Sequence, residues 1–328
     1  MSLWENRSTF ASQLGGDANL PVWTTATRRG IVPLRPLGFG DILGGAFRSV
    51  RFNPPSTLGL TLVITVGVQL LAAAGAILFA TFSGLAPLQL DMASLSNLFE
   101  TGTGAIGVLM AIGLFAGGSA VGSLLTSTLV SYVVCEGVAA RRVPPREALL
   151  RLGRRVWATL GFGLLVMLAA GVALGGWTLL ITALVMQRSG PGLAILGLLL
   201  FFGVAAVLWV KLAFTVPVIA VEGLGPIAAI GRSWALTRGR FWRTFGIQAL
   251  ATFIVQMAAS TMTQVLAIIS MAVSLQYPVA SVVATLAVSL FASALTLPLL
   301  TGVTALLYTD ARIRTEGLDI ALAEAMAE

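Results

Sequence analysis

The sequence contains no histidine and a single cysteine among its 328 residues. Histidine is the commonest general base and the commonest metal ligand, so its absence removes the usual route to acid–base catalysis and to metal binding. Cys135 has no second cysteine with which to form an intrachain disulfide. The sequence also lacks a nucleophile with a suitable base, a metal-ligand spacing and a GxxxxGKS/T phosphate loop. We therefore expect a non-catalytic protein without a metal or a cofactor.

Charged residues are also scarce. They make up 10% of the chain, whereas hydrophobic residues make up 57% and the mean hydropathy is +0.94. Soluble domains carry about 25% charged residues. The run 244–309 has no charged residue at all, and because one bilayer crossing needs about 20 apolar residues, this run is long enough for two crossings. Gln276, Tyr277 and Pro278 divide it at a predicted turn.

Further uncharged runs raise the number of predicted transmembrane helices to six. Their expected limits are 56–82, 104–135, 157–186, 192–221, 241–275 and 279–309. The sequence therefore predicts an all-α integral membrane protein. We expect its membrane domain at 37–310, between a flexible cytoplasmic tail at 1–36, which is polar and not a cleaved signal peptide, and a second cytoplasmic tail at 311–328.

The basic residues indicate how the six helices are oriented. Of the 20 lysines and arginines, all except Arg188 and Lys211 lie before the first helix, in the alternate loops 141–155 and 232–243, or after the last helix. Cytoplasmic loops are enriched in lysine and arginine, so both termini are predicted to be cytoplasmic, in a bacterial cytoplasmic membrane. The net charge of +7 then reflects topology, and we expect no nucleic-acid partner.

Three short segments combine an apolar stripe at helical spacing with arginines outside the stripe. The apolar positions are Phe39, Ile42, Leu43, Ala46, Phe47 and Val50 in the first segment, Leu149, Leu152 and Val156 in the second, and Ile227, Ile230 and Trp234 in the third. Each segment precedes a pair of predicted membrane helices. This order predicts three parallel repeats at about 37–136, 144–222 and 225–310, each beginning with an amphipathic helix on the cytoplasmic surface.

An acidic residue ends each predicted repeat: Glu136, Glu222 and Asp310. The helix macrodipole disfavours a carboxylate at a helix C-terminus, so nearby cations should offset the charge. The arginines available for this are Arg141, Arg142, Arg232, Arg312 and Arg314. The three acids are interpreted as members of structural ion pairs, with a cytoplasmic vestibule ringed by acids as the alternative.

Apart from Arg243, in the first turn of the predicted helix 241–275, Lys211 is the only charged residue inside a predicted membrane helix. If that helix continues to residue 221, Lys211 lies about 16 Å from its cytoplasmic end at 1.5 Å per residue. Charges at such depth are costly, which leaves a structural or snorkelling lysine or one that handles a ligand or ion. Pro217 is expected to bend the same helix.

Polar residues follow one another at every fourth position of the fifth predicted helix. They are Gln248, Thr252, Gln256, Ser260 and Gln264. Lipid tails would reject this stripe, so it should face other helices or line a conduction path. In the second helix, Gly118 and Gly122 have the GxxxG spacing that permits close helix contact.

Three ordered motifs resemble a known family: GIVPLRPLGFGDILGGAFRSVRFNPPSTLGL near the start, EGLGPIAAIGRSWALTRGRFWRTFGI in the middle and LLYTDARIRTEGLDIAL at the end. They are similar to the glycerophosphoryl diester phosphodiesterase membrane-domain family, in the form that stands alone in actinobacteria. The resemblance covers roughly residues 30–322. It implies an integral membrane module, and it does not imply phosphodiesterase chemistry, which belongs to a separate catalytic domain in that family.

The leading functional hypothesis is a lipid-associated accessory or scaffold module of the cell envelope. Its partners would be anionic membrane lipids, contacted by cytoplasmic arginines, each contributing about 1 kcal/mol. The candidate head-group contacts are Arg48, Arg51, Arg151, Arg154, Arg232, Arg238, Arg240 and Arg243. The alternative is a small transporter or channel that uses Lys211, the polar stripe and the three acids.

Overall fold

The structure is a computed structural model that describes residues 30–33, 37–82, 102–186, 191–274 and 278–316. These residues form helices and no strand. In chain order the helices are α2 (Phe39–Phe52), the π-helical turn η1 (Pro55–Gly59), α3 (Leu60–Phe82), α5 (Gly102–Val138), α6 (Pro145–Met186), α7 (Pro191–Leu212), α8 (Thr215–Val221), α9 (Pro226–Thr237), α10 (Phe241–Ser274) and α11 (Pro278–Glu316).

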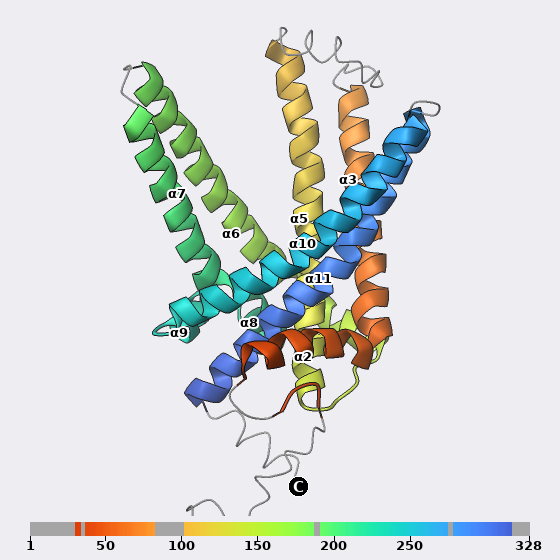
Figure 1. Ribbon diagram of the computed structural model, residues 1–328, viewed down its shortest axis with the longest axis vertical. Helices are drawn as coiled ribbons and strands as arrows, with labels where there is room; N and C mark the ends of the chain where they lie inside the picture. The colour runs from red at the N-terminus through yellow and green to blue at the C-terminus, as the bar shows by residue number, and fades with distance from the viewer. Residues whose placement is uncertain (1–29, 34–36, 83–101, 187–190, 275–277, 317–328) are drawn as a thin grey trace, which may run out of the picture.

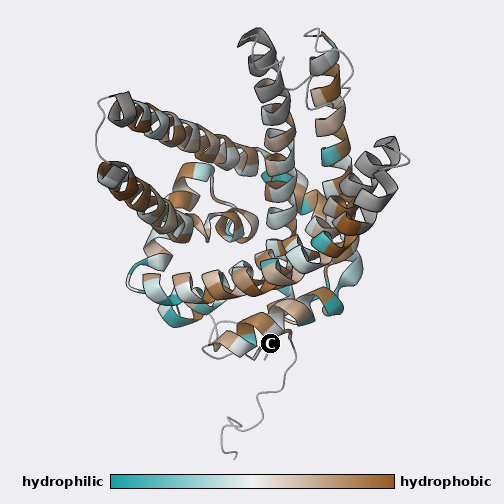
Figure 2. Ribbon diagram, turned by 45° about the horizontal axis from the view of Figure 1, so that its top comes forward, coloured by the Kyte–Doolittle hydropathy of each residue, from teal (hydrophilic) through white to brown (hydrophobic). Residues whose placement is uncertain are grey.

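Six segments are long and apolar enough to cross a membrane, which confirms the predicted number. Their limits are Pro55–Phe79, Gly113–Val138, Pro145–Ala183, Ile195–Val221, Phe241–Leu266 and Leu290–Glu316. Figure 1 shows the long helices spreading from one end of the molecule, with α6 and α7 leaning away from α3, α5, α10 and α11. Hydrophobic residues dominate α6 and α7 in Figure 2, and hydrophilic residues gather mainly at the opposite, lower end.

The best-buried part of the protein is this lower end, which we call the base. It consists of α2, α8, α9 and the adjoining ends of α5 and α11. Its core residues are almost inaccessible and include Ile42, Ala46, Val130, Val134, Phe214, Ile219, Leu306 and Tyr308. The long helices are therefore fixed at one end, while much of α6 and α7 above the base is exposed.

The second predicted amphipathic segment is not a separate helix, because α6 runs without interruption from Pro145 to Met186. The first and third segments are separate. Asn53 and Pro54 end α2, and Gly239, with φ of 77°, lies between α9 and α10. Residues 146–157 contain neither a proline nor a glycine with positive φ, so nothing stops the helix there.

The fourth predicted membrane helix is broken. It ends at Leu212 as α7, and α8 begins at Thr215. Pro217 explains the break, because its ring has no N–H and would clash with the carbonyl group four residues earlier, at Ala213. The predicted bend is therefore present, but the continuous helix to residue 221, on which the depth of Lys211 was based, is not.

The ends of the membrane domain also differ from the expected limits. Residues 30–33 were assigned to a flexible tail, yet Ile31 and Val32 are buried in the base, and the Ile31 N–H donates to the Gly137 carbonyl at 3.2 Å. The two side chains pack there because they are apolar. At the other end, α11 continues to Glu316, past the expected limit at 309. The predicted tails before residue 30 and after 316, and the turn residues Gln276 and Tyr277, lie outside the described residues.

The GxxxG pair brings α5 against α3. A Cβ atom added at Gly118 would lie 2.4 Å from Ala72 Cβ, and one added at Gly122 would lie 3.2 Å from Val68 Cγ1. The backbones can therefore approach this closely only because both positions lack a side chain.

We predict that Gly118→Ala destabilises the protein. The added methyl group must displace the Ala72 backbone, and overpacking of this kind costs about 1–3 kcal/mol. Gly113→Ala is the matched control, since a Cβ at Gly113 of the same helix meets no atom within 4 Å. Thermal unfolding in nanodiscs compares the two, and equal unfolding temperatures would contradict the close contact.

Candidate functional site

The most buried charge of the base is the Asp310 carboxylate, whose side chain is 1% exposed. It accepts a hydrogen bond from the Leu37 N–H at 2.8 Å and pairs with Arg314 at 3.0 Å and with Arg243. Arg243 also donates to the Leu37 carbonyl at 2.6 Å. Asp310 therefore joins the segment before α2 to the first turn of α10 and the end of α11.

A second cluster surrounds Glu222, at the end of α8. Its carboxylate pairs with Arg232 of α9 at 3.1 Å and accepts a hydrogen bond from the Tyr308 hydroxyl at 2.7 Å. Arg232 also pairs with Glu316 of α11, which pairs with Arg312 at 2.8 Å. Burial lowers the pKa of Arg232, but hydrogen bonds to Glu222 and Glu316 outweigh this effect and hold its pKa above the ordinary value. The cluster links α8, α9 and α11.

The third acid, Glu136, lies in a more exposed cluster. It pairs with Arg141 at 3.3 Å, and Arg141 also pairs with Glu147 at 2.8 Å. The carboxylates of Glu147 and Glu136 raise the pKa of the exposed Arg141. Tyr132 donates to Glu147 at 3.0 Å. Each of the three acids therefore forms an ion pair. Arg141, Arg232 and Arg314 are partners as expected, whereas Arg142 and Arg312 form no ion pair with these acids in the part of the chain that the structure describes.

Backbone contacts recur where each first long helix begins. The side chains of Asn53 and Ser56 donate to the Val143 carbonyl, both at 2.6 Å. Arg151 and Arg155 of α6 donate to the carbonyl groups of Val221 and Gly223, at 3.1 and 2.9 Å. Arg240, before α10, donates to those of Ala311 and Arg314, both at 3.2 Å. In each case, residues near the start of one long helix bind backbone groups near or beyond the end of the long helix that follows it in the chain.

The eight predicted head-group arginines fall into two classes. Arg151, Arg232, Arg240 and Arg243 hold the base together through the contacts above. The side chains of Arg51, Arg154 and Arg238 are exposed and make no hydrogen bond or ion pair within the described residues. Arg48 is half-buried and has no such partner in that part of the chain either, and its Nε is inaccessible. Only this second class points charge away from the protein.

Lys211 lies in the last turn of α7, next to α9. Its Nζ is 5.2 Å from the centroid of the Trp234 ring, and its carbonyl accepts a hydrogen bond from the Ser233 hydroxyl at 2.7 Å. Ser233 Oγ also accepts the Phe214 N–H at 3.2 Å. One serine thus satisfies both sides of the break between α7 and α8, and the ammonium group meets an aromatic face at the base.

The polar stripe of α10 is only partly internal. Gln248 is buried and its Oε1 accepts no hydrogen bond, whereas Gln256, Ser260 and Gln264 are exposed. At about 3.6 residues per turn, Gln256 lies on the same side of α10 as Phe245, and the Phe245 ring is 6.4 Å from that of Trp209 in α7. The exposed part of the stripe therefore starts at Gln256 on the side of α10 that meets α7 lower down, and it winds away from that side towards Gln264.

Sequence reasoning missed several residues of the base. Tyr132, Tyr308, Arg155 and Glu316 all contact the predicted acids, their arginines or the chain beside them, but they were not proposed. Only the spacing of four between Tyr308, Arg312 and Glu316 was visible as a possible helix-face contact. The others are brought together by segments distant in the sequence.

We predict that Asp310→Asn lowers the stability of the protein by about 3 kcal/mol, because removing one partner of a buried ion pair leaves uncompensated charge. Glu136→Gln is the comparison, since its pair is largely exposed and should contribute under about 1 kcal/mol. Thermal unfolding in nanodiscs measures both changes. Equal losses would show that burial does not distinguish the two clusters.

Comparison with known proteins finds one family that covers most of the described helices. A family profile described as Domain of unknown function (DUF7847) matches residues 37–311, from just before α2 into the last turns of α11. Comparisons with curated proteins and with solved structures find no match. Because the profile covers most of the 328 residues, the chain belongs to the DUF7847 family of domains of unknown function.

Proposed function

We propose that this protein is a non-catalytic, multi-pass accessory or scaffold module of the bacterial cell envelope, which associates with anionic lipids through the base. The observation that carries the proposal is the division of the arginines. One class stabilises the base, and Arg48, Arg51, Arg154 and Arg238 remain available at the end from which the apolar helices spread. In this proposal the base lies on the cytoplasmic side of the cytoplasmic membrane.

The outer face of α9 supports contact with a membrane surface. Its packing face consists of Ala229, Ser233, Leu236 and Thr237, all buried. Of the predicted apolar stripe, Ile230 packs against the core, whereas Ile227 is 76% exposed and Trp234 is 45% exposed. Arg238 follows at the C-terminal end. An apolar face beside an arginine is typical of a helix that lies in the membrane interface.

The recurring backbone contacts support an origin in three repeats. Each repeat contains two long helices, and the chain around the start of the first helix binds the chain at or after the end of the second. The helix pairs are α3 with α5, α6 with α7–α8, and α10 with α11. The repeat at 144–222 differs in having no separate amphipathic helix. Under this proposal the chain is a membrane module of the kind found in the glycerophosphoryl diester phosphodiesterase membrane-domain family, which it resembles.

We predict that Arg154→Gln combined with Arg238→Gln weakens the preference for anionic lipid. Near an anionic surface each arginine contributes about 1 kcal/mol, or roughly fivefold in binding. The exposed side chains of Trp157 and Trp234 lie within four residues of these arginines. Quenching of their fluorescence by brominated phosphatidylglycerol, relative to brominated phosphatidylcholine, measures the preference.

The double variant Arg154→Lys and Arg238→Lys is the matched control, because it keeps both charges. The preference should survive in this control and should decline with added salt in the native protein. An unchanged preference in the glutamine variant would contradict a lipid-contacting role for these arginines.

A transporter or channel is the second candidate, and the exposed polar side of α10 is the observation that favours it. Gln256, Ser260 and Gln264 would border a conduction path beside α7, with Lys211 at its lower end. If so, Lys211→Met or Gln256→Leu should abolish ion or solute flux in proteoliposomes, whereas Met257→Leu, an exposed neighbour, should not. Absence of flux in the native protein across a panel of ions would reject this candidate.

A further inference from the structure

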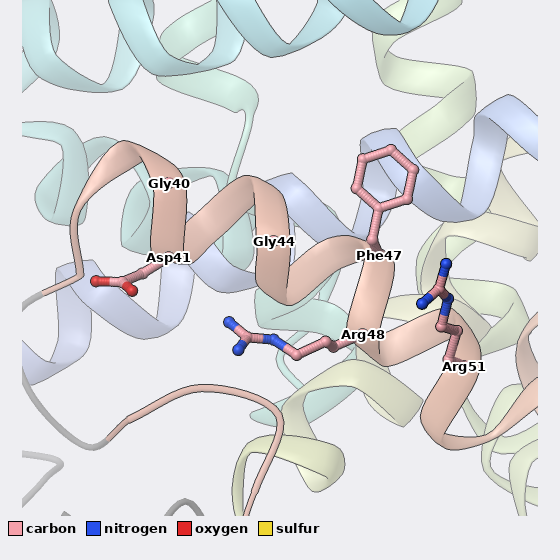
Figure 3. A pocket seen from close by; sticks show the side chains of 6 residues that line it. All are labelled: Gly40, Asp41, Gly44, Phe47, Arg48 and Arg51. Atoms are coloured by element: carbon pink, nitrogen blue, oxygen red, sulfur yellow. The ribbon is translucent and has the colours of Figure 1, made fainter.

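The outer face of α2 carries an open surface hollow. Gly40, Asp41, Gly44, Phe47, Arg48 and Arg51 line it, and its volume is about 440 Å³. In Figure 3 the Arg48 side chain extends back along the helix beneath Gly44, towards the end of the hollow where Asp41 lies. The opposite face of α2 is buried, so all six lining residues belong to the side that the protein core does not use.

The two glycines of the hollow have no packing role within the described residues. A Cβ at Gly40 would meet no atom within 4 Å, and one at Gly44 would meet only Arg48 Nη2, at 3.7 Å. Gly45, the next residue, is different, since a Cβ there would lie 2.5 Å from Val32 Cγ1. Glycine inside a helix is unfavourable relative to alanine, and it is useful where a ligand approaches the backbone closely. Gly40 and Gly44 leave that kind of space.

The arginines of the hollow supply donors without acceptors. Arg48 Nε is inaccessible and has no hydrogen-bond partner, which is costly for a polar group. Neither Arg48 nor Arg51 forms an ion pair with any residue that the structure describes. Guanidinium groups match the oxygens of phosphate in geometry and charge. A phosphate group over Gly44 would meet the terminal Nη2 of Arg48, which lies beside that glycine.

The side chains of Asp41 and Phe47, which also line the hollow, indicate which chemical groups the rest of the ligand carries. Asp41, whose Oδ2 accepts the Gly38 N–H at 3.2 Å, adds a carboxylate that disfavours a second anion and favours a hydroxyl or ammonium group. Phe47 is 47% exposed beside the arginines and offers an apolar surface. These groups suit an amphiphile better than a free phosphate ion.

We infer that the hollow on α2 binds the head group of one membrane phospholipid, with the phosphate on Arg48, a head-group hydroxyl or ammonium towards Asp41, and the start of the acyl region beside Phe47, where Arg51 adds positive charge. This inference rests on the proposed function, because it requires the base to lie at the membrane surface. It adds a specific site to a general attraction between arginines and lipid.

The test fills the hollow without changing any charge. Wild-type protein and Gly44→Leu are released from nanodiscs of phosphatidylcholine and phosphatidylglycerol, and native mass spectrometry counts retained phosphatidylglycerol. The wild type should keep a single tightly bound molecule that Gly44→Leu loses. Arg48→Gln should weaken its retention about fivefold. Gly153→Leu is the matched control, since Gly153 is also exposed between arginines of a helix and has open space around it.

The outcomes separate this site from the general proposal. Unchanged retention in both Gly44→Leu and Arg48→Gln would overturn the site, even if Arg154 and Arg238 still determine lipid preference. Loss in Gly153→Leu as well would also overturn it, because bulk alone would then displace lipid. If inorganic phosphate stabilises the wild type but not Gly44→Leu while no lipid is retained, the ligand is a free anion and the lipid assignment is wrong.

Discussion

A carboxylate withdrawn from water must have its oxygens satisfied, and in this protein that requirement determines how the ends of the helices meet. Asp310 accepts the backbone N–H of Leu37, which is 273 positions away in the sequence, together with two guanidinium groups. The chain before α2 can therefore occupy only one place relative to α10 and α11. Apolar packing around Ile42 and Leu306 then fills the space between α2 and α11. The less buried acids, Glu222 and Glu136, connect the remaining helix ends in the same way.

Arginines are costly to order, and the protein uses its basic residues for two different tasks at one surface. Those that bind carbonyl groups at helix ends, such as Arg151 at Val221 of α8 and Arg240 at Arg314 of α11, supply donors that the last carbonyls of a helix lack. Those left outside carry the positive charge that a lipid surface would meet. Composition cannot distinguish these two classes, because both occur in the same basic segments. Only the position of each side chain relative to neighbouring helix ends does so.

The membrane helices could be predicted because long uncharged runs are a local property of the sequence. The ion pairs of the three acids could also be predicted, since each acid lies beside arginines at a helix end. The break after Leu212 was anticipated only as a bend, because its full extent depends on Ser233, which binds the backbone groups on both sides. The burial of Ile31 and Val32 could not be read from a polar segment, because it depends on Gly137 and Leu306 far along the chain. The packing face of α9 was likewise only partly predicted, because Ile230 of the apolar stripe packs against the core but Ala229, Ser233 and Leu236 form most of that face.

The leaning pair α6 and α7 has a mechanical consequence. The upper parts of α6 and α7 contact each other through Trp177 and Phe201, whose ring centroids are 5.2 Å apart, and both helices are otherwise largely exposed there. A helix of 22 residues is about 33 Å long at 1.5 Å per residue, so α7 is a cantilever anchored at one end. Its tilt is set by its packing, against α6 at Trp177 and Phe201 and against α9 and α10 near its lower end. The lower end of α7 meets α8 and α9 where the Lys211 ammonium lies over the Trp234 ring and the Ser233 hydroxyl binds backbone groups on both sides of the break. A change at this junction would therefore redirect the whole length of α7.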